Sequence, residues 1–209
     1  VMPASFLVVL FYAIYLVVRN GVISYQKASG LAMFSGIVIF CFYSFIRLKE
    51  MLPVEEYGYD AIFFILLILC FAWGGDTCAY FAGRAFGKHK LCPVVSPKKT
   101  VEGAIGGVLG TMVFGVLITV IYSIAADRME EFTRSNIGVS MYVIIALLAC
   151  VAAVLGIYGD LFASVVKRQC GIKDYGTIFP GHGGILDRFD SVMFIAPFVT
   201  MVVIAAFYD

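Results

Sequence analysis

The chain has 209 residues, of which 62% are hydrophobic and only 14% are charged, and its net charge is +1 at pH 7. A water-soluble domain has about 25% charged and about 45–50% apolar residues, so this composition excludes a single water-soluble core and indicates a chain embedded in lipid. The small net charge and the lack of a basic arm give no sign of nucleic acid binding, and we expect no nucleic acid partner.

Apolar runs long enough to cross a membrane follow one another along the chain. A transmembrane helix needs about 20 mostly apolar residues. Six such runs are predicted, at residues 1–18, 31–46, 61–83, 101–126, 141–163 and 189–208. No strand pattern is visible, so we expect an all-α polytopic membrane protein with a polar site between its helices. Residues 1–59 form N-terminal membrane helices, and residues 60–209 form a second membrane domain that carries the candidate catalytic residues.

Three polar connections separate the spans of the second domain: a basic one at 84–100, an acidic one at 127–136 and a glycine-rich one at 164–188. Eleven Lys and Arg residues follow the first, third and fifth spans, and four lie on the other side. The positive-inside rule therefore places the basic and the glycine-rich connections in the cytoplasm, where nucleotides are.

Acidic residues lie in or beside the predicted spans. A charged group at the centre of a span costs about 2.5–3.5 kcal/mol, so each of them needs a reason. Asp76, Glu102, Asp160 and Asp190 are such residues, and Asp187 directly precedes the last span. One interpretation is that they simply reach the aqueous interface. Asp160 fits this poorly, because Asp is short and a long uncharged stretch precedes it.

The acidic residues of the last two spans form a candidate metal site. Asp187 and Asp190 are three residues apart, which on a helix places both carboxylates on one face. Asp160 arrives from the neighbouring span. Because Mg²⁺ prefers carboxylates, waters and phosphate oxygens as ligands, Asp160, Asp187 and Asp190 are predicted to hold a magnesium ion.

The glycine-rich connection combines cations with flexible backbone. Lys167, Arg168, Lys173 and Arg188 are interleaved with glycines, which let a backbone approach a ligand closely. Such a loop is typical of a polyphosphate receptor. The alternative is a positive cluster that touches lipid head groups. His182, between two glycines, either donates a hydrogen bond to a phosphate or has no chemical role.

A second candidate phosphate site lies in the basic connection, at residues 96–103 (Ser-Pro-Lys-Lys-Thr-Val-Glu-Gly). Thr100 can cap the helix that follows, and the N-terminal amides of that helix attract an anion. Lys98 and Lys99 lie beside this helix end. The glycines that follow, from Gly103 to Gly110, also suit close packing of helices in lipid.

The glycine-rich connection resembles the signature of the phosphatidate cytidylyltransferases, also called CDP-diacylglycerol synthases. The match runs without a gap over residues 164–190, from Ser164-Val-Val-Lys-Arg through Lys173-Asp174 to the run Pro-Gly-His-Gly-Gly-Ile-Leu-Asp-Arg-Phe-Asp. Residues 73–103 are similar to the other blocks of that family, including Trp-Gly-Gly-Asp at 73–76 and Gly83-Arg84.

The resemblance implies an integral nucleotidyltransferase of the plasma (inner) membrane that acts in phospholipid biosynthesis, usually as a homodimer. It would convert CTP and phosphatidic acid to CDP-diacylglycerol and pyrophosphate with Mg²⁺, and with K⁺ as a candidate second ion. By position, Asp160 and Asp187 match metal-holding aspartates, and Lys167 matches a lysine needed for activity. Members of the family usually have additional N-terminal spans, so we expect further residues upstream of Val1.

The expected roles follow from this reading. The expected catalytic residues are Lys167, Arg168, Asp160 and Asp187. Lys167 and Arg168 are expected to hold the lipid phosphate or the α-phosphate. The expected substrate-binding residues are Asp76, Arg84, Lys98, Lys99, Thr100, Glu102, Ser164, Lys173, Asp174, His182 and Arg188. No aromatic or amide pair identifies the residues that recognise cytosine. The alternatives are a CTP-dependent lipid kinase that transfers the γ-phosphate, and an ion transporter with Asp76 and Asp160 on its path.

Overall fold

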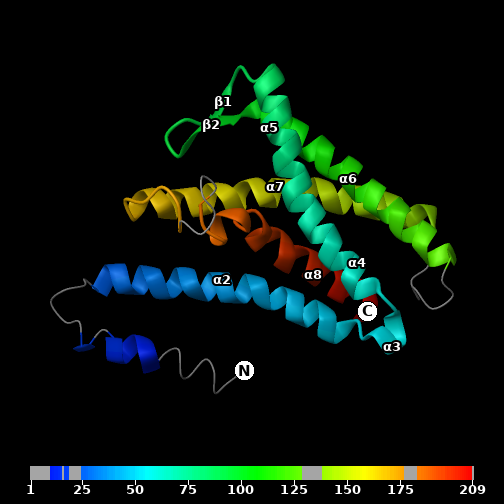
Figure 1. Cartoon of the computed structure of the whole chain (residues 1–209), viewed down its shortest axis with the longest axis horizontal. Coiled ribbons are helices and arrows are strands. Elements are labelled where there is room, and N and C mark those ends of the chain that lie inside the picture. Colours follow the sequence, from blue (N-terminus) through cyan, green and yellow to red (C-terminus); the bar gives the residue numbers. More distant parts are fainter. Residues whose placement is uncertain (1–9, 16, 19–24, 129–137, 177–182, 209) are drawn as a thin grey trace. The chain divides into compact units, whose positions relative to one another are not determined.

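The structure is a computed structural model that describes residues 10–15, 17–18, 25–128, 138–176 and 183–208. It divides into two units, Val1–Cys41 and Phe42–Asp209. The described residues are mostly helical, as the composition predicts (Figure 1).

Among the described residues, four helices are long and apolar enough to cross a membrane. They are Ala28–Met51 within α2 (Tyr25–Met51), the run Asp60–Phe86, α6 (Val101–Arg128) and α7 (Val139–Gln169). A shorter apolar stretch, Val192–Ala206, lies within α8 (Val192–Tyr208). The chain is thus an integral membrane protein. The predicted count of six spans stays a prediction, because the run 1–18 lies largely outside the described residues.

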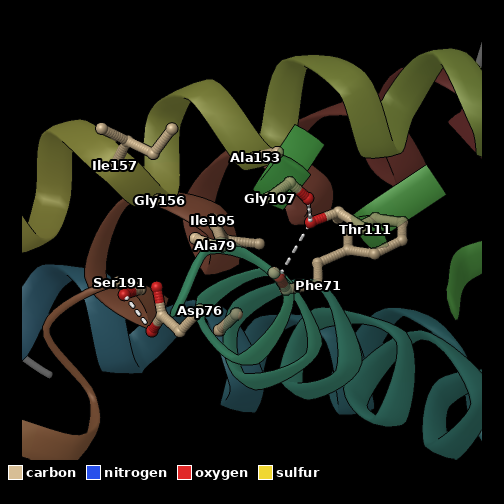
Figure 2. Close-up of a pocket in the computed structure, with 12 residues that line it drawn as sticks. Phe71, Asp76, Ala79, Gly107, Thr111, Ala153, Gly156, Ile157, Ser191 and Ile195 are labelled. Carbon is tan, nitrogen blue, oxygen red and sulfur yellow. Dashed lines mark hydrogen bonds between the residues drawn. The ribbon is translucent and has the colours of Figure 1, made fainter. Parts of the chain in front are cut away.

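The run Asp60–Phe86 is not a uniform helix. After the short α3 (Val54–Tyr57), it consists of α4 (Asp60–Leu69), a π-helical turn η1 (Cys70–Gly74) and α5 (Gly75–Phe86). A π turn changes the hydrogen-bond pattern of a helix and is frequent at functional sites. The Thr111 hydroxyl of α6 lies 3.5 Å from the carbonyl oxygen of Phe71 in this turn and 2.8 Å from that of Gly107 (Figure 2). The turn ends just before Asp76.

A two-stranded antiparallel hairpin joins α5 to α6. Its strands are β1 (Lys90–Cys92) and β2 (Ser96–Thr100). The prediction that the chain contains no strands is therefore wrong in this connection. The strands are short, and their Lys- and Pro-rich sequence lacks the alternation of apolar and polar residues that reveals a strand.

Small residues bring α5 and α6 into close contact. A Cβ atom added to Gly103 would lie 2.9 Å from the carbonyl oxygen of Ala79, and one added to Gly106 would overlap the Ala82 side chain. This confirms the packing role predicted for these glycines. Figure 1 shows the hairpin at the C-terminal end of α5, where the basic connection begins. Helix α6 contacts α7, and α7 contacts α8.

The helix ends around the last connection differ from the prediction. Helix α7 continues to Gln169, so Lys167 and Arg168 lie in its last turn and not in a loop. Helix α8 begins only at Val192, and Asp187 lies in a short 3₁₀ turn, η2 (Leu186–Arg188). The prediction that Asp187 and Asp190 share the face of a transmembrane helix is therefore wrong. Gly183, with a φ of 83°, adopts the left-handed backbone that favours glycine just before this turn.

Candidate functional site

A cavity of about 460 Å³, with charged side chains in its lining, lies where α5, the hairpin, α6, α7 and the η2 segment meet. This volume is within the range of small-molecule sites. The predicted site residues that line it are Asp76, Arg84, Lys98, Lys99, Thr100, Asp160, Asp187 and Asp190. Residues far apart in the sequence are thus brought to one place, with carboxylates from three segments facing cations of the hairpin.

An ion pair connects the hairpin to α7. Lys99 Nζ lies 2.5 Å from Asp160 Oδ2, and about a quarter of each side chain is exposed. The Ser164 hydroxyl, one helical turn further along α7, donates a hydrogen bond of 3.3 Å to Asp160 Oδ1. Asp160 is therefore the point at which the two predicted phosphate sites meet.

A second ion pair connects α7 to the η2 segment. Lys167 Nζ lies 2.9 Å from Asp187 Oδ1, and the two side chains are only 11% and 6% exposed. Asp187 Oδ2 accepts hydrogen bonds from the backbone amides of Tyr175 (2.8 Å) and Gly184 (2.9 Å). Burial opposes the charge of Asp187, but these hydrogen bonds together hold its pKa below the ordinary value. Lys167 also lies over the ring of Tyr175, 5.3 Å from the ring centre.

Ser191 joins the remaining two carboxylates. Its hydroxyl donates a hydrogen bond of 2.8 Å to Asp76 Oδ2 (Figure 2), and its backbone amide donates one of 2.9 Å to Asp190 Oδ1. Burial and the nearby charges of Asp160 and Asp76 raise the pKa of Asp190 to about 7. Sequence reasoning missed Ser191, because a serine beside an aspartate carries no distinctive signal.

Behind Asp76 lies a small internal space of about 20 Å³, which is room for about one water molecule. Figure 2 shows its walls, formed by the π turn, by Gly107 and Thr111 of α6, and by Gly156 of α7. The small side chains at this point allow three helices to approach one another directly beneath the larger cavity.

The carboxylates of the cavity suit a hard divalent cation. Asp76, Asp160 and Asp190 interact electrostatically with one another, and gathered carboxylates repel unless a proton or a cation lies among them. Within the described residues no group of three Asp, Glu, His or Cys side chains is arranged at ligand distances. Asp187 has both oxygens engaged, so it could bind a metal directly only after releasing partners such as Lys167.

The predicted helix cap is confirmed. The backbone amide of Gly103 donates a hydrogen bond of 3.1 Å to Thr100 Oγ1, which caps α6. Lys98 and Lys99 precede this cap on β2, so cations and the positive end of the α6 dipole lie on the same wall of the cavity.

Several predicted residues lie outside the cavity lining. Glu102 accepts hydrogen bonds from the backbone amides of Lys88 (3.1 Å) and His89 (3.2 Å), and it lies 2.6 Å from His89 Nδ1. It therefore fastens the base of the hairpin. The residues that are exposed and away from the lining are Arg168, Lys173, Asp174 and Arg188. His182 lies outside the described residues.

Comparison with known proteins gives a consistent result. The sequence model of the cytidylyltransferase family matches residues 1–206. The chain is 32% identical over 198 residues to the phosphatidate cytidylyltransferase of Bacillus subtilis, covering 95% of this chain and 66% of that protein. It is 40% identical over 145 residues to the phosphatidate cytidylyltransferase of Staphylococcus haemolyticus, covering 69% of this chain and 50% of that protein. The chain thus spans about half to two thirds of the length of these relatives.

Proposed function

The chain belongs to the cytidylyltransferase family, and on that premise we propose that it acts as a phosphatidate cytidylyltransferase, making CDP-diacylglycerol and pyrophosphate from CTP and phosphatidic acid. The observation that carries this proposal is one cavity in which Asp76, Asp160 and Asp190 face Lys98 and Lys99, at the junction of membrane-length helices. Such a site can receive both a triphosphate and the phosphate of a lipid.

In the proposed reaction, a phosphate oxygen of phosphatidic acid attacks the α-phosphorus of CTP. The bond from that phosphorus to the bridging oxygen of the β-phosphate breaks, and pyrophosphate leaves with the bonding electrons. The lipid phosphate is already ionised at neutral pH, so no general base is required. Catalysis of such a transfer consists mainly of alignment and charge neutralisation.

The cations of the chain bring two anionic substrates together. Lys98 and Lys99 on β2, with the capped end of α6, are placed to hold the phosphates of CTP. Lys167, at the end of α7, is assigned to the lipid phosphate or the α-phosphate. It would exchange its contact with Asp187 for a substrate oxygen, and Arg168 in the same turn would support it from outside the lining.

Mg²⁺, when bound, would supply a positive charge that stabilises the departing pyrophosphate. Asp160 and Asp190 would hold it, with Asp187 joining if Lys167 releases it. Asp76 is fixed by Ser191 at the edge of the same group. The K⁺ ion that the family resemblance implies is proposed as a second ion of this carboxylate group.

The membrane arrangement is part of the proposal. The basic hairpin and the end of α7 would face the cytoplasm, as the excess of Lys and Arg in these connections suggests. The acyl chains of phosphatidic acid would stay in the bilayer while CTP enters from water. Six spans, an inner-membrane location and a homodimer complete the proposed assembly.

Labelled CTP tests the function directly. We expect purified protein in detergent, given phosphatidic acid, Mg²⁺ and CTP labelled at the α-phosphate, to transfer the label to lipid and to release pyrophosphate. Label that reaches lipid only from the γ-phosphate would identify a lipid kinase. If no label reaches lipid from either phosphate position, both the cytidylyltransferase and the lipid kinase hypotheses are contradicted. The Asp160→Asn variant serves as the inactive control.

A further inference from the structure

Among the described residues that line the cavity, Tyr80 alone is aromatic. It lies on α5 between Asp76 and Arg84, which are four residues before and after it, so the three side chains share one face of the helix. All three line the cavity. Tyr80 as a residue is 60% exposed, which leaves it available to a ligand.

The rest of the described lining offers no second aromatic surface. Apart from Tyr80 and the charged side chains, it consists of Thr100, glycine, alanine and two aliphatic residues, Leu91 and Ile157. The cations that suit a triphosphate, Lys98 and Lys99, lie on β2. With the phosphates of a nucleotide held there, Tyr80 is the flat surface that the described lining offers to the base.

Arg84 lies beside the ring. Its Nη1 atom is 3.4 Å from the Tyr80 hydroxyl, and among the described residues no ion pair involves Arg84. A guanidinium group can only donate hydrogen bonds. The O2 and N3 atoms of cytosine are both acceptors, whereas N3 of uracil carries a hydrogen. A guanidinium that faces this edge therefore favours cytosine over uracil.

We infer that Tyr80 and Arg84 form the cytosine-recognition site of the enzyme, with the base stacked on the Tyr80 ring and its O2 and N3 atoms hydrogen-bonded to Arg84. This inference rests on the proposed function, because it takes CTP as the nucleotide. It assigns the selection of the base to Tyr80 and Arg84 of α5, and leaves the phosphates to the carboxylates and to the lysines of β2.

Binding without turnover tests the stacking surface. Calorimetric titration of the detergent-purified protein, with no phosphatidic acid present, would use CTP and, as a ligand without a base, pyrophosphate. Stacking of a base on an aromatic ring accounts for about 5- to 150-fold in affinity. We expect Tyr80→Leu to weaken CTP binding within this range and to leave pyrophosphate binding unchanged, whereas Tyr80→Phe keeps both. Phe86→Leu, an exposed aromatic residue of the same helix outside the lining, is the matched control.

Competition between CTP and UTP tests the role of Arg84. We expect Arg84→Gln to reduce the preference for CTP over UTP by about tenfold, as for other hydrogen-bonded readings of a base edge. Equal loss of CTP, UTP and pyrophosphate binding would show that Arg84 holds phosphates and would overturn its part in base recognition. Normal CTP binding by Tyr80→Leu, or loss of CTP and pyrophosphate alike, would overturn the stacking surface.

Two further measurements keep the outcomes distinct. Tyr80→Trp places a fluorescent indole in the cavity, and we expect CTP but not pyrophosphate to quench the emission that this variant adds to that of the wild type. It also tests the site if Tyr80→Leu does not fold. If the wild-type protein transfers the α-label and the Tyr80 variants bind CTP with normal affinity, only this inference is contradicted. A wild-type protein that neither binds CTP nor transfers the label defeats the proposed function.

Discussion

At the scale of single residues, the site depends on lysines that each hold a carboxylate. Lys99 lies against Asp160 and Lys167 against Asp187. The second pair is more deeply buried, and Asp187 also holds two backbone amides. Removing one partner of a buried pair leaves a charge without compensation, which destabilises a protein by about 3–5 kcal/mol, whereas replacing both partners by apolar residues is often close to neutral.

One single and one double variant separate the structural role of this pair from its catalytic role. We expect Asp187→Asn to abolish cytidylyl transfer while the protein remains inserted in the membrane, and to lower the Tm because Lys167 loses its partner. The double variant Asp187→Leu with Lys167→Met should recover much of the Tm but none of the activity. Thermal unfolding and α-label transfer provide the two readings. Near-normal transfer by Asp187→Asn would contradict a catalytic role for Asp187. The control is Asp174→Asn, because Asp174 is exposed and lies outside the lining.

At the scale of elements, the contact between α5 and α6 positions the cavity wall. Gly103 and Gly106 let the two helices approach so closely that Tyr80 and Arg84 on one and Thr100 before the other line the same cavity. Glu102 adds to this by fastening the base of the hairpin that carries Lys98 and Lys99. The wall is therefore built by small residues and by one carboxylate that does not itself line the cavity.

Enlarging a glycine at this contact should separate the helices. We expect Gly106→Val to lower the Tm and to raise the KM for CTP, because its Cβ atom would overlap the Ala82 side chain and displace α5 from α6. Gly36→Val is the matched control, since a Cβ atom at Gly36 of α2 meets nothing within 4 Å. Equal effects of the two substitutions on the KM would show that the helix contact does not position the nucleotide site.

The elements also show what the sequence can and cannot predict. The apolar runs that become α6 and α7 are visible from composition alone, because lipid requires long apolar helices. The hairpin is not visible in the sequence, because β1 and β2 are short and polar and have no alternation of apolar and polar residues. Only their pairing with each other in the structure reveals them. Lys167 was expected in a loop, since a run of charged residues after an apolar span is typical of one, yet α7 extends far enough to include it.

The site shows the same division. Asp160 and Asp187 could be predicted as site residues because a carboxylate near lipid needs a reason. Their partners could not, because the pairing of Asp160 with Lys99, or of Asp76 with Ser191, joins residues far apart in the sequence. Tyr80 gave no signal on its own, and only the cavity distinguishes it from the other aromatic residues of α5.

At the scale of the whole molecule, orientation in the membrane decides which substrates can reach the cavity. We propose that the hairpin and the end of α7 face the cytoplasm, because Lys and Arg are in excess in these connections. Cys170, the exposed residue that follows α7, reports on this placement without any substitution. In a bacterial inner membrane, we expect a membrane-impermeant maleimide to label Cys170 in inverted vesicles and not in intact cells. Cys170→Ser identifies the signal, and a cysteine introduced at Val94, 93% exposed in the hairpin, should label from the same side. Labelling of Cys170 in intact cells would place the cavity on the side without CTP, and the proposed reaction would lose its nucleotide.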